Sequence, residues 1–157
     1  DPGLSGAIAI LENNKVLNIF EIPVMSEGKK NKRQLNSAQL VKLLKDNISE
    51  KDEVSVVVEQ VNAMPGQGVT SMFNFGQTFG AIKGVCAALG LPIFFVRPSK
   101  WKKHFELINS SKDSSRTKAI EMYPSLSDDL ARKKDVNKSD AILIARFYSE
   151  TRLNEGN

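Results

Sequence analysis

Apolar and polar positions along the chain fall into blocks, and the first blocks predict a β-hairpin. Residues 6–11 and 16–22 are two apolar runs, and the polar tetrad from Glu12 to Lys15 lies between them. Short apolar runs on both sides of a turn-forming tetrad are typical of paired antiparallel strands. The next block starts at Ser37, which we expect to cap an amphipathic helix. The apolar positions of that helix are Leu40, Val41, Leu43, Leu44 and Ile48.

After this helix the pattern alternates between strand-like and helical segments. The β-branched run from Val54 to Val61 predicts a buried strand, and residues 93–96 predict a second short one. The helix between them should start at Thr70 or Ser71 and end at Gly90. Further helical patterns cover residues 99–105, 114–123 and 139–148. A hairpin followed by alternating helices and strands predicts one α/β domain over residues 1–157, with a central mixed β-sheet flanked by helices.

The helix that ends at Gly90 has two faces of different character. One face is apolar and is expected to lie in the core: Met72, Phe75, Phe79, Ile82, Cys86 and Leu89. The opposite face carries Gly76, Gly80 and Gly84, each of which costs about 1 kcal/mol of helix propensity. These glycines predict the close approach of another element, either the sheet or the same helix of a partner chain.

Three acidic residues stand at the ends of apolar segments. Asp1 begins Asp-Pro-Gly, Glu59 closes the strand that starts at Val54, and Asp140 precedes the apolar stretch 141–145. A carboxylate desolvated at such a place is costly unless a cation shares the site. Carboxylates without a Cys or His cluster match Mg²⁺ or Mn²⁺, and pairs of such ions cut phosphodiesters. We therefore interpret the chain as a metal-dependent nuclease.

Each of these acids also has a simpler interpretation. Asp-Pro-Gly alone is more often a turn, and Glu59 could belong to a strand end that reaches solvent. Asp140 could be an ordinary acid favoured by the dipole at the start of a helix. Their joint occurrence at three element ends that an α/β sheet brings together favours the functional interpretation.

Composition narrows the class of partner. The chain has 157 residues, of which 41% are hydrophobic, and this is enough for one domain with a core. The 22 Lys and Arg residues against 18 Asp and Glu give a net charge of +4, which favours a polyanionic partner. Cys86 is the one cysteine, so a disulfide framework is absent and a reducing cytoplasm fits best. No apolar stretch reaches the roughly 18 residues of a membrane span, so we expect no membrane partner.

The position of Asp1 predicts that residues precede it. An α-ammonium group beside this carboxylate would compete with any metal, and the strand leading into Asp1 would lack half its length. We expect upstream residues and an N-terminal strand that is truncated in this sequence.

Basic residues concentrate between residues 97 and 118, where Glu106 and Asp113 are the acids. The cluster contains Arg97, Lys100, Lys102, Lys103, Lys112, Arg116 and Lys118. A basic run is often a solvated face, but Trp101 and Phe105 within it favour a groove that tracks a nucleic-acid backbone by charge and stacking. A second cluster, in a stretch expected to be irregular, contains Lys29, Lys30, Lys32 and Arg33. A structural role is expected for His104.

A glycine-rich loop follows Glu59 and spans residues 62–69. It is either a flexible connection or a tip that enters a DNA junction and reads bases. Gln67 is the side chain in it best suited to donate and accept hydrogen bonds at once, and it lies between Gly66 and Gly68.

The motifs together resemble the RuvC-type Holliday junction resolvases of the ribonuclease H-like fold, and look closest to their phage and plant chloroplast branch. They are Asp1-Pro2-Gly3, Glu59-Gln60, Trp101-Lys102-Lys103-His104-Phe105, Pro124-Ser125-Leu126-Ser127 and Lys133-Lys134-Asp135 followed by Asp140-Ala141. The resemblance runs nearly end to end. It implies a homodimer that cuts four-way DNA junctions symmetrically with Mg²⁺ and leaves ligatable nicks.

One position departs from the family pattern. Many members carry a second acid or a histidine three residues before the last-helix aspartate, whereas this chain has Asn137 there. Asp135 is five residues before Asp140 and can converge on it only from the preceding loop. The expected metal ligands are thus Asp1, Glu59 and Asp140 with Asp135 assisting, around two Mg²⁺ ions about 4 Å apart, with Mn²⁺ as a substitute. Asn137 is a neutral ligand or a donor to one.

The expected phosphate contacts and base contact complete this hypothesis: Gln67, Lys100, Lys102, Lys103, Lys112, Arg116 and Lys118. Two other classes compete with it. One is a junction-binding module without catalysis, if the Asn137 change or a missing N-terminal segment disables the metal site. The other is an actin-like or sugar-kinase-like phosphate-binding domain, which Asp1-x-Gly3-x-Ser5 resembles. Those proteins need a second such loop and about twice this length, so this class ranks low.

Overall fold

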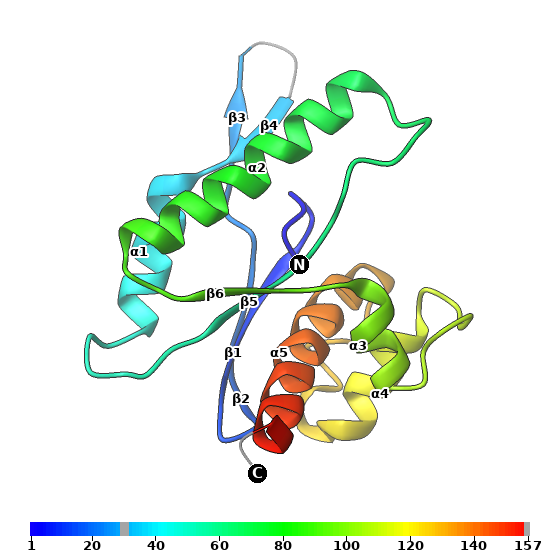
Figure 1. The fold of residues 1–157 in the computed structure, drawn as a ribbon. Coiled ribbons are helices and arrows are strands. Elements are labelled where there is room, and N and C mark those ends of the chain that lie inside the picture. Colours follow the sequence, from blue (N-terminus) through cyan, green and yellow to red (C-terminus); the bar gives the residue numbers. More distant parts are fainter. Residues whose placement is uncertain (29–31, 156–157) are drawn as a thin grey trace.

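The strands lie between two groups of helices. In the computed structural model the described residues are 1–28 and 32–155, with side chains described up to Arg152. Helices α1 (Ser37–Asn47) and α2 (Val69–Ala88) lie on one side, and α3 (Pro98–His104), α4 (Ser114–Met122) and α5 (Val136–Glu155) lie on the other (Figure 1). The two faces hold separate cores, one around Leu40, Val58 and Cys86, the other around Trp101 and Ile142.

The predicted first hairpin is confirmed. Strands β1 (Ala7–Glu12) and β2 (Lys15–Glu21) pair antiparallel, with Glu12 opposite Lys15. Asn13 and Asn14 form the turn with φ angles of 50° and 62°. Asparagine tolerates this left-handed conformation better than most residues, which is why the tetrad closes a tight hairpin.

A second hairpin was not expected. Strands β3 (Val24–Glu27) and β4 (Lys32–Leu35) pair antiparallel, with Glu27 opposite Lys32. The expectation of an irregular stretch at Lys32 and Arg33 is therefore wrong, whereas Lys29 and Lys30 lie outside the described residues. Only Leu35 of this hairpin is buried, so its sequence carries little of the apolar alternation that predicts strands.

The parallel pair β5 (Val56–Glu59) and β6 (Ile93–Val96) is joined by α2, and both strands end at the same edge. Glu59 lies opposite Val96, and the N–H of Gln60 donates to the carbonyl of Val96 at 2.8 Å. The apolar run at 54–61 thus contains a strand shorter than expected. Helix α2 connects the end of β5 to the start of β6, so the two strands run parallel and end side by side. The carboxyl end of β5 therefore lies next to the residues that lead from β6 into α3.

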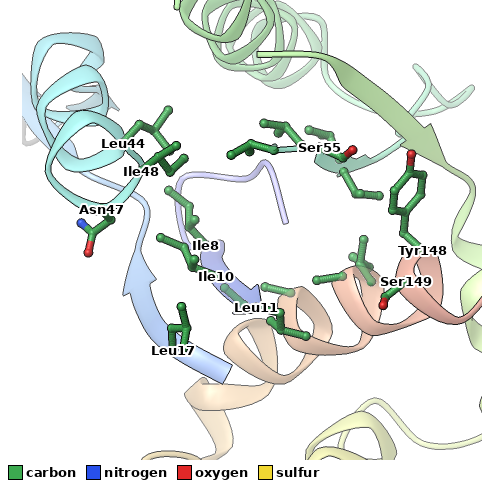
Figure 2. Close-up of a pocket in the computed structure, with 18 of the residues that line it drawn as sticks. Ile8, Ile10, Leu11, Leu17, Leu44, Asn47, Ile48, Ser55, Tyr148 and Ser149 are labelled. Atoms are coloured by element: carbon green, nitrogen blue, oxygen red, sulfur yellow. The ribbon is translucent and has the colours of Figure 1, made fainter. Parts of the chain in front are cut away.

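The mixed α/β architecture is confirmed, but the strands form three separate pairs among the described residues rather than one continuous sheet. A cavity of about 1000 Å³ lies between β1 and the segment around β5. Its lining is mainly apolar and includes Ile8, Ile10, Leu44 and Ile48, with Tyr148 of α5 across from them (Figure 2).

The helix boundaries differ in small ways from the sequence pattern. Asn36, rather than Ser37, caps α1, and its Oδ1 accepts from the N–H of Gln39 at 3.0 Å. The last helix, α5, begins at Val136 instead of Ser139, after a 3-10 turn at Lys133–Asp135. No helix within residues 1–28 and 32–155 is long and apolar enough to cross a membrane.

A polar network ties α3 and α5 to the first hairpin. His104 Nε2 lies 2.5 Å from a carboxylate oxygen of Glu150, whose other oxygen accepts from Arg146 Nε at 2.6 Å. Arg146 also donates to the Tyr123 hydroxyl at 3.0 Å, and that hydroxyl donates to the Asn14 carbonyl at 2.7 Å. These contacts give His104 a place in the packing of the two helices.

The turn before β1 holds residues 1–6 next to the β1–β2 hairpin. The N–H of Gly6 donates to the carbonyl of Gly3 at 2.9 Å, and the carbonyl of Gly6 accepts from the N–H of Ile22 at 3.1 Å. A Cβ at Gly6 would lie 2.1 Å from the carbonyl oxygen of Asp1, whereas one at Gly3 would meet nothing closer than 3.9 Å. Of these two positions, only position 6 lacks room for a side chain and therefore requires glycine.

We predict that Gly6→Ala lowers the free energy of unfolding by about 1–3 kcal/mol, because the added methyl forces the Asp1 backbone away. Gly3→Ala is the matched control and should change stability by less than about 0.5 kcal/mol. Urea denaturation of the two variants measures the difference. Equal stability of both variants would mean that the turn is not held as described.

Candidate active site

Glu59 is held at the end of β5 by the indole of Trp101. The Nε1–H of Trp101 donates to Glu59 Oε2 at 2.7 Å, and the side chain of Trp101 has an exposed fraction of 0%. Trp101 comes from α3, which begins immediately after β6, so the parallel pair of strands brings the two residues together. The expected stacking of Trp101 and Phe105 on DNA is therefore wrong, because both rings are buried in the core.

Asp140 joins Glu59 from the second turn of α5. Burial raises the pKa of the Asp140 carboxyl; the Ser115 hydroxyl opposes this shift, the negative charge of Glu59 adds to it, and Lys102 opposes it. Glu59, Asp140, Lys102 and Ser115, which come from β5, α5, α3 and α4, are thus near enough to influence the charge of Asp140. Two of the four are acids, and both are partly buried.

Asp1 lies beside the start of β1, where its backbone nitrogen donates to the carbonyl of Ala7 at 3.2 Å. The carboxylate turns back to accept from the N–H of Gly3 at 3.4 Å. In this arrangement the Asp1 carboxylate does not complete a three-acid group with Glu59 and Asp140 among the described residues.

Asp135 is buried and ion-paired in the turn that leads into α5. Its side chain is 2% exposed and pairs with Arg132 at 3.1 Å and with Lys138 at 3.2 Å. Its carboxylate also accepts from the backbone N–H of Arg132 at 2.9 Å. The hydrogen bond from the Arg132 guanidinium is the main cause that holds the pKa of this carboxyl far below its usual range. In this structure Asp135 is an ion-paired cap on the turn that leads into α5, and its assisting metal role stays a prediction.

Asn137 holds the start of α5 against the N-terminal turn. Its Nδ2 donates to the carbonyl of Ser5 at 2.7 Å. Because the donor is committed to the Asp1–Gly6 turn, Asn137 positions the segment that carries Asp1 relative to the helix that carries Asp140.

The residues present fit a divalent cation that is completed by substrate. Among residues 1–28 and 32–155, no group of three or more His, Cys, Asp or Glu side chains is arranged to hold a metal ion. Glu59 and Asp140 form a pair, and Mg²⁺ usually binds through one or two carboxylates together with waters and substrate phosphates. The Ser115 hydroxyl is buried and makes no hydrogen bond of normal length within the described residues, but it lies near enough to Asp140 to lower the pKa of that carboxyl. A buried hydroxyl in this position can donate to the carboxylate or to the hydration shell of a bound cation. No pattern in the sequence indicated a role for Ser115.

The basic residues separate into structural and accessible groups. Arg116 binds both carboxylate oxygens of Asp113 at 2.8 and 2.9 Å and donates to the carbonyls of Leu130 and Ala131. These donors hold α4 to the following loop in this structure, and the phosphate contact of Arg116 stays a prediction. Lys118 lies 3.7 Å from Glu121, and Lys102 lies over the Trp101 ring at 5.5 Å. The exposed residues of the cluster are Arg97, Lys100, Lys103 and Lys112.

Gln67 lies in the exposed glycine-rich loop of residues 62–69. Its Oε1 accepts from the N–H of Met64 at 3.4 Å, and its own N–H donates to the carbonyl of Met64 at 3.3 Å. Gly66 has a φ angle of 87°, which permits this tight turn. The loop is thus a structured turn in which the side-chain amide group of Gln67 stays exposed.

The search of solved structures finds a similar fold in RuvC from Thermus thermophilus. The match has a TM-score of 0.50 and 18% sequence identity, and it covers 82% of this chain and 86% of that chain. At this identity the likeness shows the fold alone, and it confirms the RuvC-like fold expected from the motifs. No family model matches the sequence, and no curated protein matches it.

We predict that Asp135→Asn destabilises the protein without disabling the site. Loss of the charged hydrogen bonds should lower the free energy of unfolding at pH 7 by about 2–3 kcal/mol. The folded-state pKa of Asp135 lies below its unfolded value, so its contribution is present above about pH 4 and lost as the pH falls further. The difference between wild type and variant should therefore shrink in acid, as urea denaturation at several pH values can measure. An unchanged stability together with lost divalent-cation binding would instead make Asp135 a ligand.

Proposed function

We propose that the chain is a divalent-cation-dependent endonuclease that resolves four-way DNA junctions by paired symmetric nicks. The observation that carries this proposal is the proximity of two partly buried carboxylates, Glu59 and Asp140, to the buried hydroxyl of Ser115, at the carboxyl end of a parallel strand pair. The RuvC-like fold supports the class of reaction, and the motif order supports the phage and chloroplast branch.

Glu59 and Asp140 would hold the cations, with the Asp1 carboxylate as a third ligand after rotation away from Gly3. Two Mg²⁺ ions, or Mn²⁺ in their place, would supply a water nucleophile at neutral pH and stabilise the leaving 3′ oxygen. Trp101 keeps Glu59 oriented, and Lys102 neutralises part of the local negative charge. The exposed Lys100, Lys103 and Lys112 are the side chains suited to bind backbone phosphates.

A homodimer would supply the symmetry of the cuts. Gly76, Gly80 and Gly84 are exposed, and a Cβ at any of them would meet nothing within 4 Å in this chain. The alternative expectation, that these glycines admit the sheet, is therefore wrong. An exposed helix face without side chains suits the same helix of a second copy, which would set two sites in opposite orientation.

The exposed turn at Met64–Gln67 would then read the crossover. Phosphate contacts carry no sequence information, so base discrimination requires a group such as the Gln67 amide. A junction-binding module without catalysis is the second candidate. It is favoured by the Asp1 carboxylate, which faces Gly3 instead of completing a three-acid cluster.

The first test is catalytic. Glu59→Gln and Asp140→Asn should each lower the rate of junction cleavage by at least about a hundredfold, because each removes a negative charge that binds the cation. Junction affinity should stay equal or improve, since phosphate contacts are retained. Asp128→Asn, at an exposed aspartate, is the control and should cleave like wild type. Cleavage by Glu59→Gln at the wild-type rate would refute the metal mechanism, and a wild-type protein that binds junctions but never cuts them would favour the binding module.

The second test concerns assembly. Gly80→Leu should yield a folded monomer, because the exposed position tolerates the side chain within one chain but not between two packed helices. Sedimentation analysis should then show a loss of dimer, and the two nicks in a junction should become uncoupled. Lys45→Leu, on the exposed surface of α1, is the matched control for added hydrophobicity. A monomeric wild-type protein on DNA would contradict the proposed assembly.

A further inference from the structure

Trp101 is a fixed hydrogen-bond donor to one oxygen of Glu59. Its ring has an exposed fraction of 0% and packs with Phe105, Leu130 and Ile142 in the second core. A buried indole cannot reorient without repacking its neighbours. The Nε1–H, which lies 2.7 Å from Glu59 Oε2, therefore has a direction set by the core rather than by the site.

This donor divides the two oxygens of Glu59 into different roles. Oε2 accepts from the indole, and within the described residues the Glu59 carboxylate makes no other side-chain hydrogen bond. Oε1 is thus the oxygen left for a ligand. A cation that takes both oxygens would have to compete with the indole N–H, and a charge-assisted hydrogen bond of this length is among the stronger ones.

Divalent cations differ in how they use a carboxylate. Ca²⁺ accepts six to eight oxygens in flexible geometry, often with both oxygens of one carboxylate, whereas Mg²⁺ demands near-octahedral geometry and keeps several waters. We propose that Trp101 is a specificity-determining positioning residue, which restricts Glu59 to one-oxygen ligation and so makes the site prefer Mg²⁺ or Mn²⁺ over Ca²⁺. This inference rests on the cation site of the proposed function but not on junction cutting.

The test measures cation binding to the DNA-free protein. Isothermal titration calorimetry with Mg²⁺ and with Ca²⁺ gives the ratio of the two dissociation constants for each variant. Trp101→Phe keeps an aromatic ring and removes the N–H, so the preference for Mg²⁺ over Ca²⁺ should fall by about tenfold, the value of one charge-assisted hydrogen bond. Because Trp101 is the one tryptophan in the chain, biosynthetic replacement by benzothienylalanine removes the N–H at this position alone with the ring shape retained. It should give the same fall, and it covers the case in which Trp101→Phe does not fold.

Lys102→Gln is the matched control. The lysine ammonium lies over the same ring at 5.5 Å but makes no contact with the indole N–H, so its loss should tighten Mg²⁺ and Ca²⁺ binding together and leave their ratio unchanged. Wild-type tryptophan fluorescence gives an independent readout and should change on titration with Mg²⁺, while Glu59→Gln should suppress the change.

An unaltered ratio in both the Phe and the benzothienyl proteins would overturn the proposal, as would wild-type protein that binds neither cation. Selective cation binding by a protein that does not cut junctions would leave this inference standing and refute the nuclease function instead. The two failures are therefore distinguishable.

Discussion

Burial of α5 is the constraint on which the rest of the structure depends. Its segment from Ala141 to Ile144 is almost completely removed from solvent, between β1 on one side and α4 on the other. Burying four consecutive side chains requires that neighbouring elements surround the helix, and α3 and the β5–β6 pair complete that enclosure. Asp140 immediately precedes this segment, so a carboxylate is carried into the interior by the hydrophobic effect acting on its neighbours. The site is thus located by the packing of the helix.

Much of the fold could be predicted from the sequence because local signals and tertiary packing agree. Two adjacent asparagines tolerate the left-handed turn of the first hairpin, and Gly90 ends α2 with a φ angle of 67°. The β3–β4 hairpin was missed because nearly all of its side chains are exposed, and a strand pair without a buried face leaves no apolar period in the sequence. The three strand pairs also could not be foreseen, because strand pairing depends on contacts between distant segments.

The site was predictable in its acids and poorly predictable in the residues around them. Glu59 and Asp140 stand where apolar segments end, a pattern visible in the sequence. Residue type alone does not reveal the internal contacts of Trp101, Arg116 and Asp135, since an indole, a guanidinium and a carboxylate serve equally well as internal hydrogen-bond partners and as ligand contacts. Only the folded structure shows that the Arg116 guanidinium donates to Asp113 and to backbone carbonyls. It also shows that Asp135 lies between the side chains of Arg132 and Lys138. The surface charge available to a polyanion is consequently smaller than the count of basic residues in the cluster.

The apolar cavity between β1 and the segment around β5 gives the molecule a mechanical weak point. The cavity is partly open to solvent, and only the part of it that water does not fill adds to the volume lost on unfolding, which lowers stability under hydrostatic pressure. Pressure should destabilise the structure first where packing is interrupted, which is the boundary between the β1–β2 hairpin and strand β5. The two hydrophobic cores lie on opposite sides of that boundary. High pressure would therefore weaken the contact between the two cores before it disrupts the packing within either core.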